Sequence, residues 1–158
     1  MLKSYLEILK EDLLKKSEIL DRLTAMSSEQ QKIASAERFD TDAFDKIVDD
    51  KDQLVQELIK LDDGFEETYS HIRDELPARK DEFKTEIALL QDLIRKVTNQ
   101  SMVLQALEER NKEMVAKALK ITRSQYSQSR LSSKVAFDYY KNMTRVNYID
   151  PQLMDRKK

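Results

Sequence analysis

The sequence has 158 residues, of which 37% are charged and 40% hydrophobic, and its net charge at pH 7 is −2. It contains no Cys, one His, one Gly and two Pro. This composition excludes disulfides, thiolate catalysis, cysteine zinc sites and glycine-rich phosphate loops. Tight hairpin turns depend on Gly, so the composition favours long helices with a narrow apolar seam.

The first segment, residues 2–36, carries an apolar seam of the coiled-coil type. Its seam positions alternate in steps of four and three, and they are Leu2, Leu6, Leu9, Leu13, Lys16, Leu20, Leu23, Ser27, Gln30 and Ala34. Such a pattern predicts one long helix. A second stripe, Ile19, Met26 and Ile33, recurs every seven residues. Two stripes predict contacts on two sides, and therefore a bundle of three or more helices.

The second segment begins within "ERFDTDAF" (37–44) and runs over residues 41–76. Asp40 and Thr41 can both cap a helix through their side-chain oxygens. Phe39 and Phe44 flank this position with the spacing of a hydrophobic staple. The sequence therefore predicts a helix start here.

Gly64 lies inside the seam of this second segment. The seam positions are Phe44, Ile47, Lys51, Leu54, Leu58, Leu61, Phe65, Thr68 and Ile72. A glycine in a helix interior costs about 1 kcal/mol relative to Ala, and a true break would divide the segment into two shorter helices. Because the seam keeps its phase across Gly64, we expect one continuous helix.

Pro77 ends the second helix, since its ring disfavours helical geometry at the preceding residue. Either a reversal or a kinked continuation fits, because Pro also suits the first turn of a new helix. The seam of the third segment comprises Phe83, Ile87, Leu90, Ile94, Val97, Gln100, Leu104, Leu107, Asn111, Met114, Ala118 and Ile121. Two consecutive steps of three, from Ile94 to Gln100, predict a local overwinding of the coil, called a stammer.

Together these patterns predict an all-α fold, an elongated antiparallel three-helix coiled-coil bundle with a loosely ordered C-terminal tail. The expected helices cover about 2–36, 41–76 and 78–123. Residues 124–158 form a serine-rich linker and an aromatic, basic tail, in which seven Lys/Arg outnumber three Asp/Glu. Residues 1–123 are acidic, with 21 Lys/Arg against 27 Asp/Glu. An acidic body without a basic stripe argues against nucleic acid as a partner.

Catalytic and metal-binding patterns are not evident. His71 has Asp74 and Glu75 at helical spacing, but a di-iron bundle needs a Glu-x-x-His motif on each of two helices. We therefore expect a solvent-facing histidine, no enzyme activity, no cofactor and no metal. The N-terminus lacks the features of a signal peptide, and no apolar run approaches the roughly 20 residues that span a bilayer. A cytoplasmic protein without membrane contact is expected.

The third segment has more apolar residues than its seam requires. Met102, Val103, Met114 and Val115 widen it, as do Leu89 and Leu93. They either contact a second neighbour in the bundle or line a groove for the amphipathic helix of a partner. The proposed partner-binding residues are Leu89, Leu93, Val103, Leu107, Asn111, Met114 and Val115.

Two stretches resemble the FlgN/FliT class of flagellar type III export chaperones. "LEERNKEMVAKAL" (107–119) is similar to the third helix of that family, with Asn111, Leu107, Met114 and Leu119 at the matching positions. "YIDPQLMDRKK" resembles the short hydrophobic, Asp and basic ending of many members. The resemblance implies a chaperone that uses no cofactor. Such a chaperone binds the C-terminal helical segment of a hook-filament junction or cap protein, prevents its self-association and delivers it to the export apparatus.

The tail would then have a separate role. Its aromatic anchors, proposed for docking, are Phe137, Tyr139, Tyr140 and Tyr148. They would cover the empty client groove, dock on the export machinery, or simply pack against the end of the bundle. The alternative function is a structural coiled-coil adaptor without a client cycle, which forms a homodimer through the seam from Leu2 to Leu23. An enzyme on a helical bundle is the third class.

Overall fold

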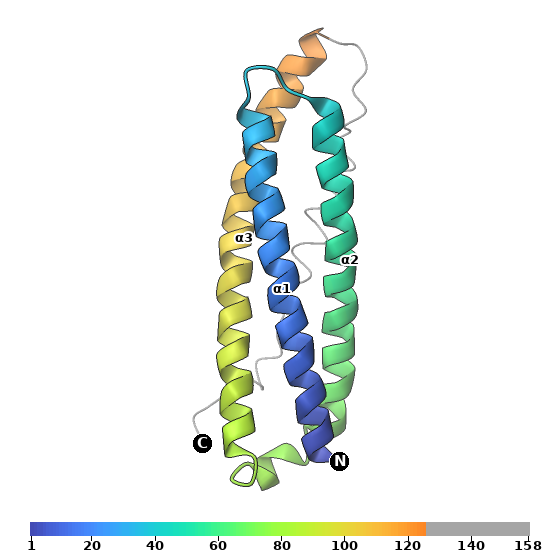
Figure 1. The fold of residues 1–158 in the computed structure, drawn as a ribbon, viewed down its shortest axis with the longest axis vertical. Coiled ribbons are helices and arrows are strands. Elements are labelled where there is room, and N and C mark those ends of the chain that lie inside the picture. Colours follow the sequence, from blue (N-terminus) through green and yellow to red (C-terminus); the bar gives the residue numbers. More distant parts are fainter. Residues whose placement is uncertain (126–158) are drawn as a thin grey trace.

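Three long helices and one short 3-10 helix make up the computed structural model, which describes residues 1–125. They are α1 (Leu2–Ser35), α2 (Thr41–Ile72), η1 (Leu76–Arg79) and α3 (Lys84–Gln125). Consecutive long helices run in opposite directions in an elongated rod, and α1 packs against both α2 and α3 (Figure 1). The predicted all-α three-helix bundle is confirmed. Within this part of the chain, no helix has an apolar stretch that could cross a bilayer.

The start of α2 is held by the two devices that the sequence predicts. The Asp40 side chain accepts a hydrogen bond of 3.1 Å from the Ala43 backbone N–H, and Asp40 is the N-cap residue. The rings of Phe39 and Phe44 pack with their centroids 5.4 Å apart. Of the two candidate caps, the structure uses Asp40, because Thr41 is the first helical residue.

Gly64 lies within one continuous helix, as predicted, and its φ is not positive. At Pro77 the chain reverses, which settles the choice between reversal and kink. The reversal needs more residues than the sequence suggested, because α2 ends at Ile72 and α3 begins at Lys84, with η1 between them. Arg79 holds this turn through ion pairs with Glu75 (2.8 Å) and Glu82 (2.6 Å).

The seam of α1 is confirmed at every position. All predicted seam residues from Leu2 to Gln30 are buried, Ala34 is half-buried, and Ser17 is buried beside them. The flanking stripe of Ile19, Met26 and Ile33 is half-buried and packs against the core. This second stripe exists because α1 has neighbours on two sides.

The seams of α2 and α3 differ from the prediction in part. Leu54 is buried as predicted, but some predicted seam residues are only half-buried, and these are Ile47, Leu61, Thr68, Gln100, Leu107 and Met114. In α2 the inward positions are Phe44, Val48, Lys51, Val55, Leu58, Asp62, Phe65, Tyr69 and Ile72. In α3 they are Phe83, Ile87, Leu90, Ile94, Val97, Ser101, Leu104, Glu108, Asn111, Val115 and Ala118. Both series alternate in steps of four and three without interruption. The predicted stammer is therefore wrong, because Ser101 and not Gln100 continues the seam.

The buried apolar residues form two separate clusters. The base cluster fills most of the rod and comprises Leu2, Leu6, Leu9, Leu13, Leu20, Leu23, Leu54, Val55, Leu58, Ile59, Tyr69, Ile72, Leu76, Phe83, Leu90, Ile94, Val97 and Leu104. The distal cluster comprises Phe44, Val48 and Val115, with Ile33, Ala34 and Phe39 packed against it. Buried polar side chains lie between the two clusters.

Candidate functional site

A layer of five buried polar residues joins all three helices. Ser27 and Gln30 come from α1, Lys51 from α2, and Glu108 and Asn111 from α3, and none is more than 3% exposed. Lys51 Nζ donates to Gln30 Oε1 at 2.5 Å and to Glu108 Oε1 at 2.6 Å. Ser27 Oγ donates to Glu108 Oε1, and Asn111 Nδ2 donates to the Ser27 carbonyl at 2.8 Å. We call this group the polar layer.

The electrostatics of the polar layer make it costly to disrupt. Burial lowers the pKa of Lys51, and the nearby Glu108 carboxylate opposes that shift. Within the described residues, Glu108 Oε2 and Asn111 Oδ1 have no hydrogen-bond partner. A buried ion pair gains little over apolar packing, but a single remaining charge is strongly destabilising. The layer therefore fixes the register of the three helices more than it adds stability.

A second set of polar contacts lies nearer the base. Lys16 pairs with Asp62 at 2.8 Å, which ties α1 to α2. Gln100 Nε2 donates to the Ser17 carbonyl at 3.2 Å and to Asp21 Oδ1 at 2.7 Å, which ties α3 to α1. These contacts fix how α1 packs against α2 and α3. The surfaces between these helices are therefore preformed.

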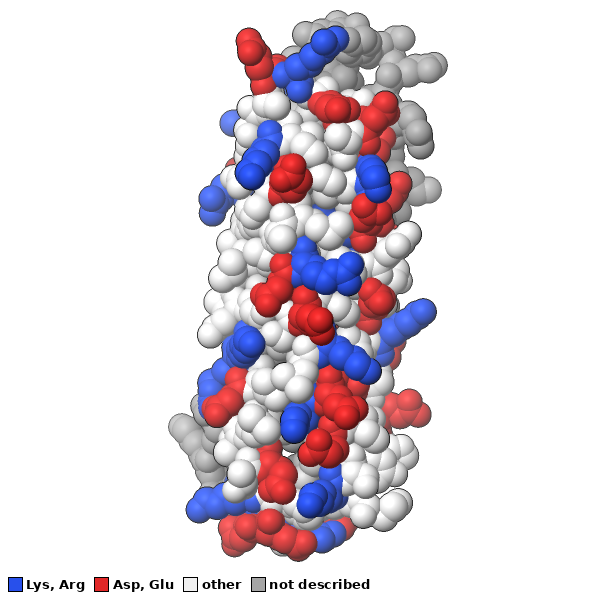
Figure 2. Space-filling model, viewed as in Figure 1, with Lys and Arg blue, Asp and Glu red and all other residues white. Residues whose placement is uncertain are grey.

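The outer face of α3 carries an uncharged surface at mid-length. Residues 97–107 form the longest run without Asp, Glu, Lys or Arg in a sequence that is 37% charged. Within it, Met102 and Val103 are 63% and 60% exposed. Figure 2 shows uncharged surface at mid-height on the side of the rod where α3 lies. We call residues 97–107 the neutral belt.

The residues proposed for partner binding are not all on one surface. Leu89 and Val103 are exposed, whereas Asn111 and Val115 are buried inside the bundle. The others, Leu93, Leu107 and Met114, are half-buried. The buried pair faces inward because it occupies the true seam of α3. The sequence pattern did not distinguish the exposed residues from the buried ones, because both lie within the same widened apolar stripe of α3.

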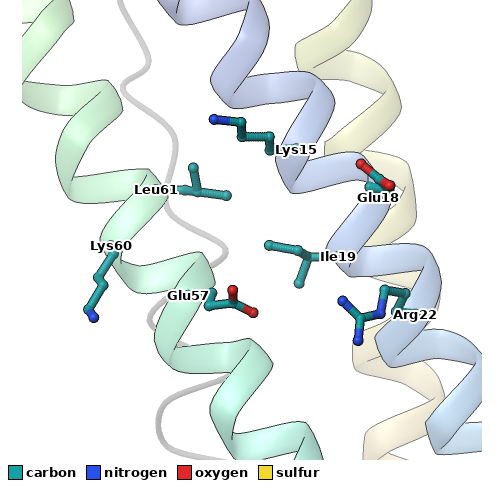
Figure 3. Close-up of a pocket in the computed structure, with 7 residues that line it drawn as sticks. All are labelled: Lys15, Glu18, Ile19, Arg22, Glu57, Lys60 and Leu61. Carbon is teal, nitrogen blue, oxygen red and sulfur yellow. The ribbon is translucent and has the colours of Figure 1, made fainter.

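A groove between α1 and α2 forms a second candidate surface. It has a volume of about 400 Å³ and is lined by Lys15, Glu18, Ile19, Arg22, Glu57, Lys60 and Leu61. Ile19 and Leu61 face each other across it, with charged side chains around them (Figure 3). Sequence reasoning did not single out this groove. The one unusual residue that the sequence shows near the groove is Gly64, which lies one helical turn beyond Leu61.

His71 and the acidic residues near it do not form a metal site. His71 is exposed and stacks on Tyr5, with ring centroids 5.3 Å apart. Across residues 1–125, no three potential metal ligands among His, Cys, Asp and Glu gather in one place.

The predicted docking residues of the tail lie outside the described residues. They are Phe137, Tyr139, Tyr140 and Tyr148.

The seam from Leu2 to Leu23 cannot serve the adaptor alternative in this fold. Its leucines are at most 2% exposed, because α2 and α3 cover them within the same chain. Dimerisation through that seam would require the bundle to open. Among residues 1–125, the neutral belt and the groove remain as candidate partner surfaces on the outside of the bundle.

These features define an elongated three-helix bundle with a buried polar layer, an uncharged stretch on α3 and a groove between α1 and α2. The chain belongs to the FlgN protein family, because the sequence model of that family matches residues 1–134. This is the family of flagellar export chaperones, so the resemblance found in the sequence is confirmed. Comparisons with curated proteins and with solved structures gave no match.

Proposed function

We propose that this flagellar export chaperone binds the C-terminal helical segment of a late flagellar substrate, a hook-filament junction or cap protein, on the outer face of α3. Binding keeps that segment from self-associating until it is delivered to the export apparatus in the cytoplasm. The proposal combines the family membership with one structural observation, the exposed neutral belt around Met102 and Val103.

The chemistry of the neutral belt suits an amphipathic helix. A surface without charges lets a partner helix pack its apolar stripe against Met102 and Val103 without desolvating ions. Methionine adapts to differently shaped partners. Leu89, which is 42% exposed, is a separate apolar residue nearer the base of α3.

A matched pair of substitutions tests the proposal. Val103 is 60% exposed and Val115 is 3% exposed, yet both are valines on the same helix. Val103→Glu should change the free energy of unfolding by less than about 0.5 kcal/mol, as exposed sites usually do. It should weaken binding of the client segment at least about ten-fold, or roughly 1.4 kcal/mol, because the carboxylate loses its water in the complex.

Val115→Glu should instead lower stability by several kcal/mol, because it buries an unpaired charge. Ala25→Glu, at an exposed position of α1, serves as the control for added charge. Binding is measured by calorimetry with the purified C-terminal segments of the junction and cap proteins, and stability by chemical unfolding. Unchanged client affinity in Val103→Glu would remove the neutral belt from the client surface.

A further inference from the structure

The groove between α1 and α2 is a second surface, separate from the neutral belt. Its floor is formed by Ile19 and Leu61, which point toward each other from the two helices (Figure 3). A volume of about 400 Å³ falls within the range of sites that take up bulky groups. The site is preformed, because the Lys16–Asp62 pair joins α1 and α2 beside it.

Gly64 leaves open space on α2 next to the groove. A glycine in a helix interior costs about 1 kcal/mol relative to Ala. Nothing inside the protein requires it, since its φ is not positive and a Cβ at this position would meet no atom within 4 Å. Gly64 lies one turn from Leu61 and two turns from Glu57, on the same side of α2. A residue without a side chain lets a partner backbone come close.

The charges around the groove indicate the kind of partner. Lys15, Arg22 and Lys60 outnumber Glu18 and Glu57 in its lining. This local excess of positive charge lies on a body with fewer Lys/Arg than Asp/Glu. Neither Arg22 nor Lys60 forms an ion pair with any of the described residues.

We infer that the groove between α1 and α2 docks an amphipathic helix of a partner protein, whose apolar residues cover Ile19 and Leu61 and whose acidic residues face Lys15, Arg22 and Lys60. The chain's own tail is a poor occupant by charge, because its seven Lys/Arg outnumber three Asp/Glu. This site is distinct from the client surface proposed on α3, so the chaperone can hold two helices at once.

Two synthetic peptides of equal length probe the groove. Both carry leucines at helical spacing i, i+3, i+4 and i+7, and they differ only in having Glu or Lys at the flanking positions. Titrated into the isotope-labelled full-length chain, the acidic peptide should shift the amide signals of Ile19, Leu61 and Gly64. The basic peptide should bind at least about ten-fold more weakly. Added salt should weaken the acidic peptide's binding.

Gly64→Gln separates binding from folding. Gln is a better helix former than Gly, so the melting temperature should stay equal or rise. The long side chain should block the partner and lower affinity for the acidic peptide at least about ten-fold. Ser28→Gln, at an exposed position of α1 off the stripe that lines the groove, is the control and should change neither quantity.

Val103→Glu tells this site apart from the client surface. It should leave binding of the acidic peptide unchanged, even if the proposal for the neutral belt fails. Equal affinity for both peptides, signal shifts confined to α3, or unchanged binding in Gly64→Gln would each overturn the inference. Self-association that Gly64→Gln abolishes would also overturn it, because the occupant would then be a second copy of the chain.

Discussion

The two ends of the bundle are built differently, although the same three helices run through both. Eighteen buried apolar residues form the base cluster, and only three form the distal cluster. The polar layer separates them, so the two clusters do not share a continuous apolar contact. Stability is therefore distributed unevenly along the rod. We expect the distal end, around Phe44 and Val115, to open at a lower free energy than the base.

Breaking the polar layer should give the largest effect. Lys51→Met leaves the Glu108 carboxylate buried without its cation, and we expect a loss of about 3–5 kcal/mol in the free energy of unfolding. The matched double variant Lys51→Met with Glu108→Leu removes both charges and should recover most of that loss. Chemical unfolding measures both. A double variant as unstable as the single one would show that the ion pair itself contributes the stability.

The contrast between the clusters predicts that losing core atoms affects different parts of the rod. Leu20→Ala in the base, which removes three carbon groups, should cost about 2–5 kcal/mol. Val48→Ala in the distal cluster should cost about 1.5 kcal/mol, from two lost carbon groups at about 0.8 kcal/mol each. Native-state hydrogen exchange should show the Val48 change only in amides of the distal end. Equal effects on exchange at both ends would mean that the bundle unfolds as one unit.

A substitution at Gly64 should stabilise the base of the bundle without stabilising its distal end. Gly64→Ala should stabilise α2 by about 1 kcal/mol, because the new methyl group meets no neighbouring atom. Opening free energies measured by hydrogen exchange should rise for amides of the base and stay unchanged near Phe44. A rise at both ends would contradict the division at the polar layer.

Asp12 should give the smallest effect. Desolvation by burial raises its pKa above the ordinary 3.8, while the nearby Lys15 ammonium partly opposes the shift. Between 3.8 and the raised pKa, the folded chain binds more protons than the unfolded chain. The free energy of unfolding therefore falls as pH rises through this window and stays lower at neutral pH.

Asp12→Asn removes this titration. It should raise stability at pH 7 within the roughly 0.5 kcal/mol that is typical of surface changes. Below pH 3.8 the variant and the parent chain should converge. Thermal melts over this pH range measure the difference, and a variant less stable at pH 7 would be inconsistent with the raised pKa.

How far the sequence predicted the structure depends on which residues occupy the seams. The seam of α1 was predicted in full because most of its positions are leucines and its polar members fall in phase. In α2 and α3 the prediction followed apolar neighbours such as Leu61 and Leu107, whereas Asp62 and Glu108 take the inward positions. Those polar residues face inward because their partners, Lys16 and Lys51, come from other helices.

The candidate sites were predicted only in part for the same reason. The excess apolar residues of α3 were recognised, but one helix pattern could not tell Val103, which is exposed, from Val115, which is buried. The groove depends on Ile19 and Leu61, which are 42 residues apart in the chain and meet only in the folded bundle. No pattern within a single segment of the sequence could have indicated that these two residues meet.

The central position of α1 also sets the order in which the chain can assemble. Its polar contacts with α2 close loops of 21 and 46 residues, whereas those with α3 close loops of 79 to 84 residues. Longer loops lose more chain entropy on closure and slow the search for contacts. During synthesis, α1 and α2 leave the ribosome first and can pair as a hairpin. Among the described helices, we therefore expect α3, which carries the neutral belt, to dock after α1 and α2 have paired.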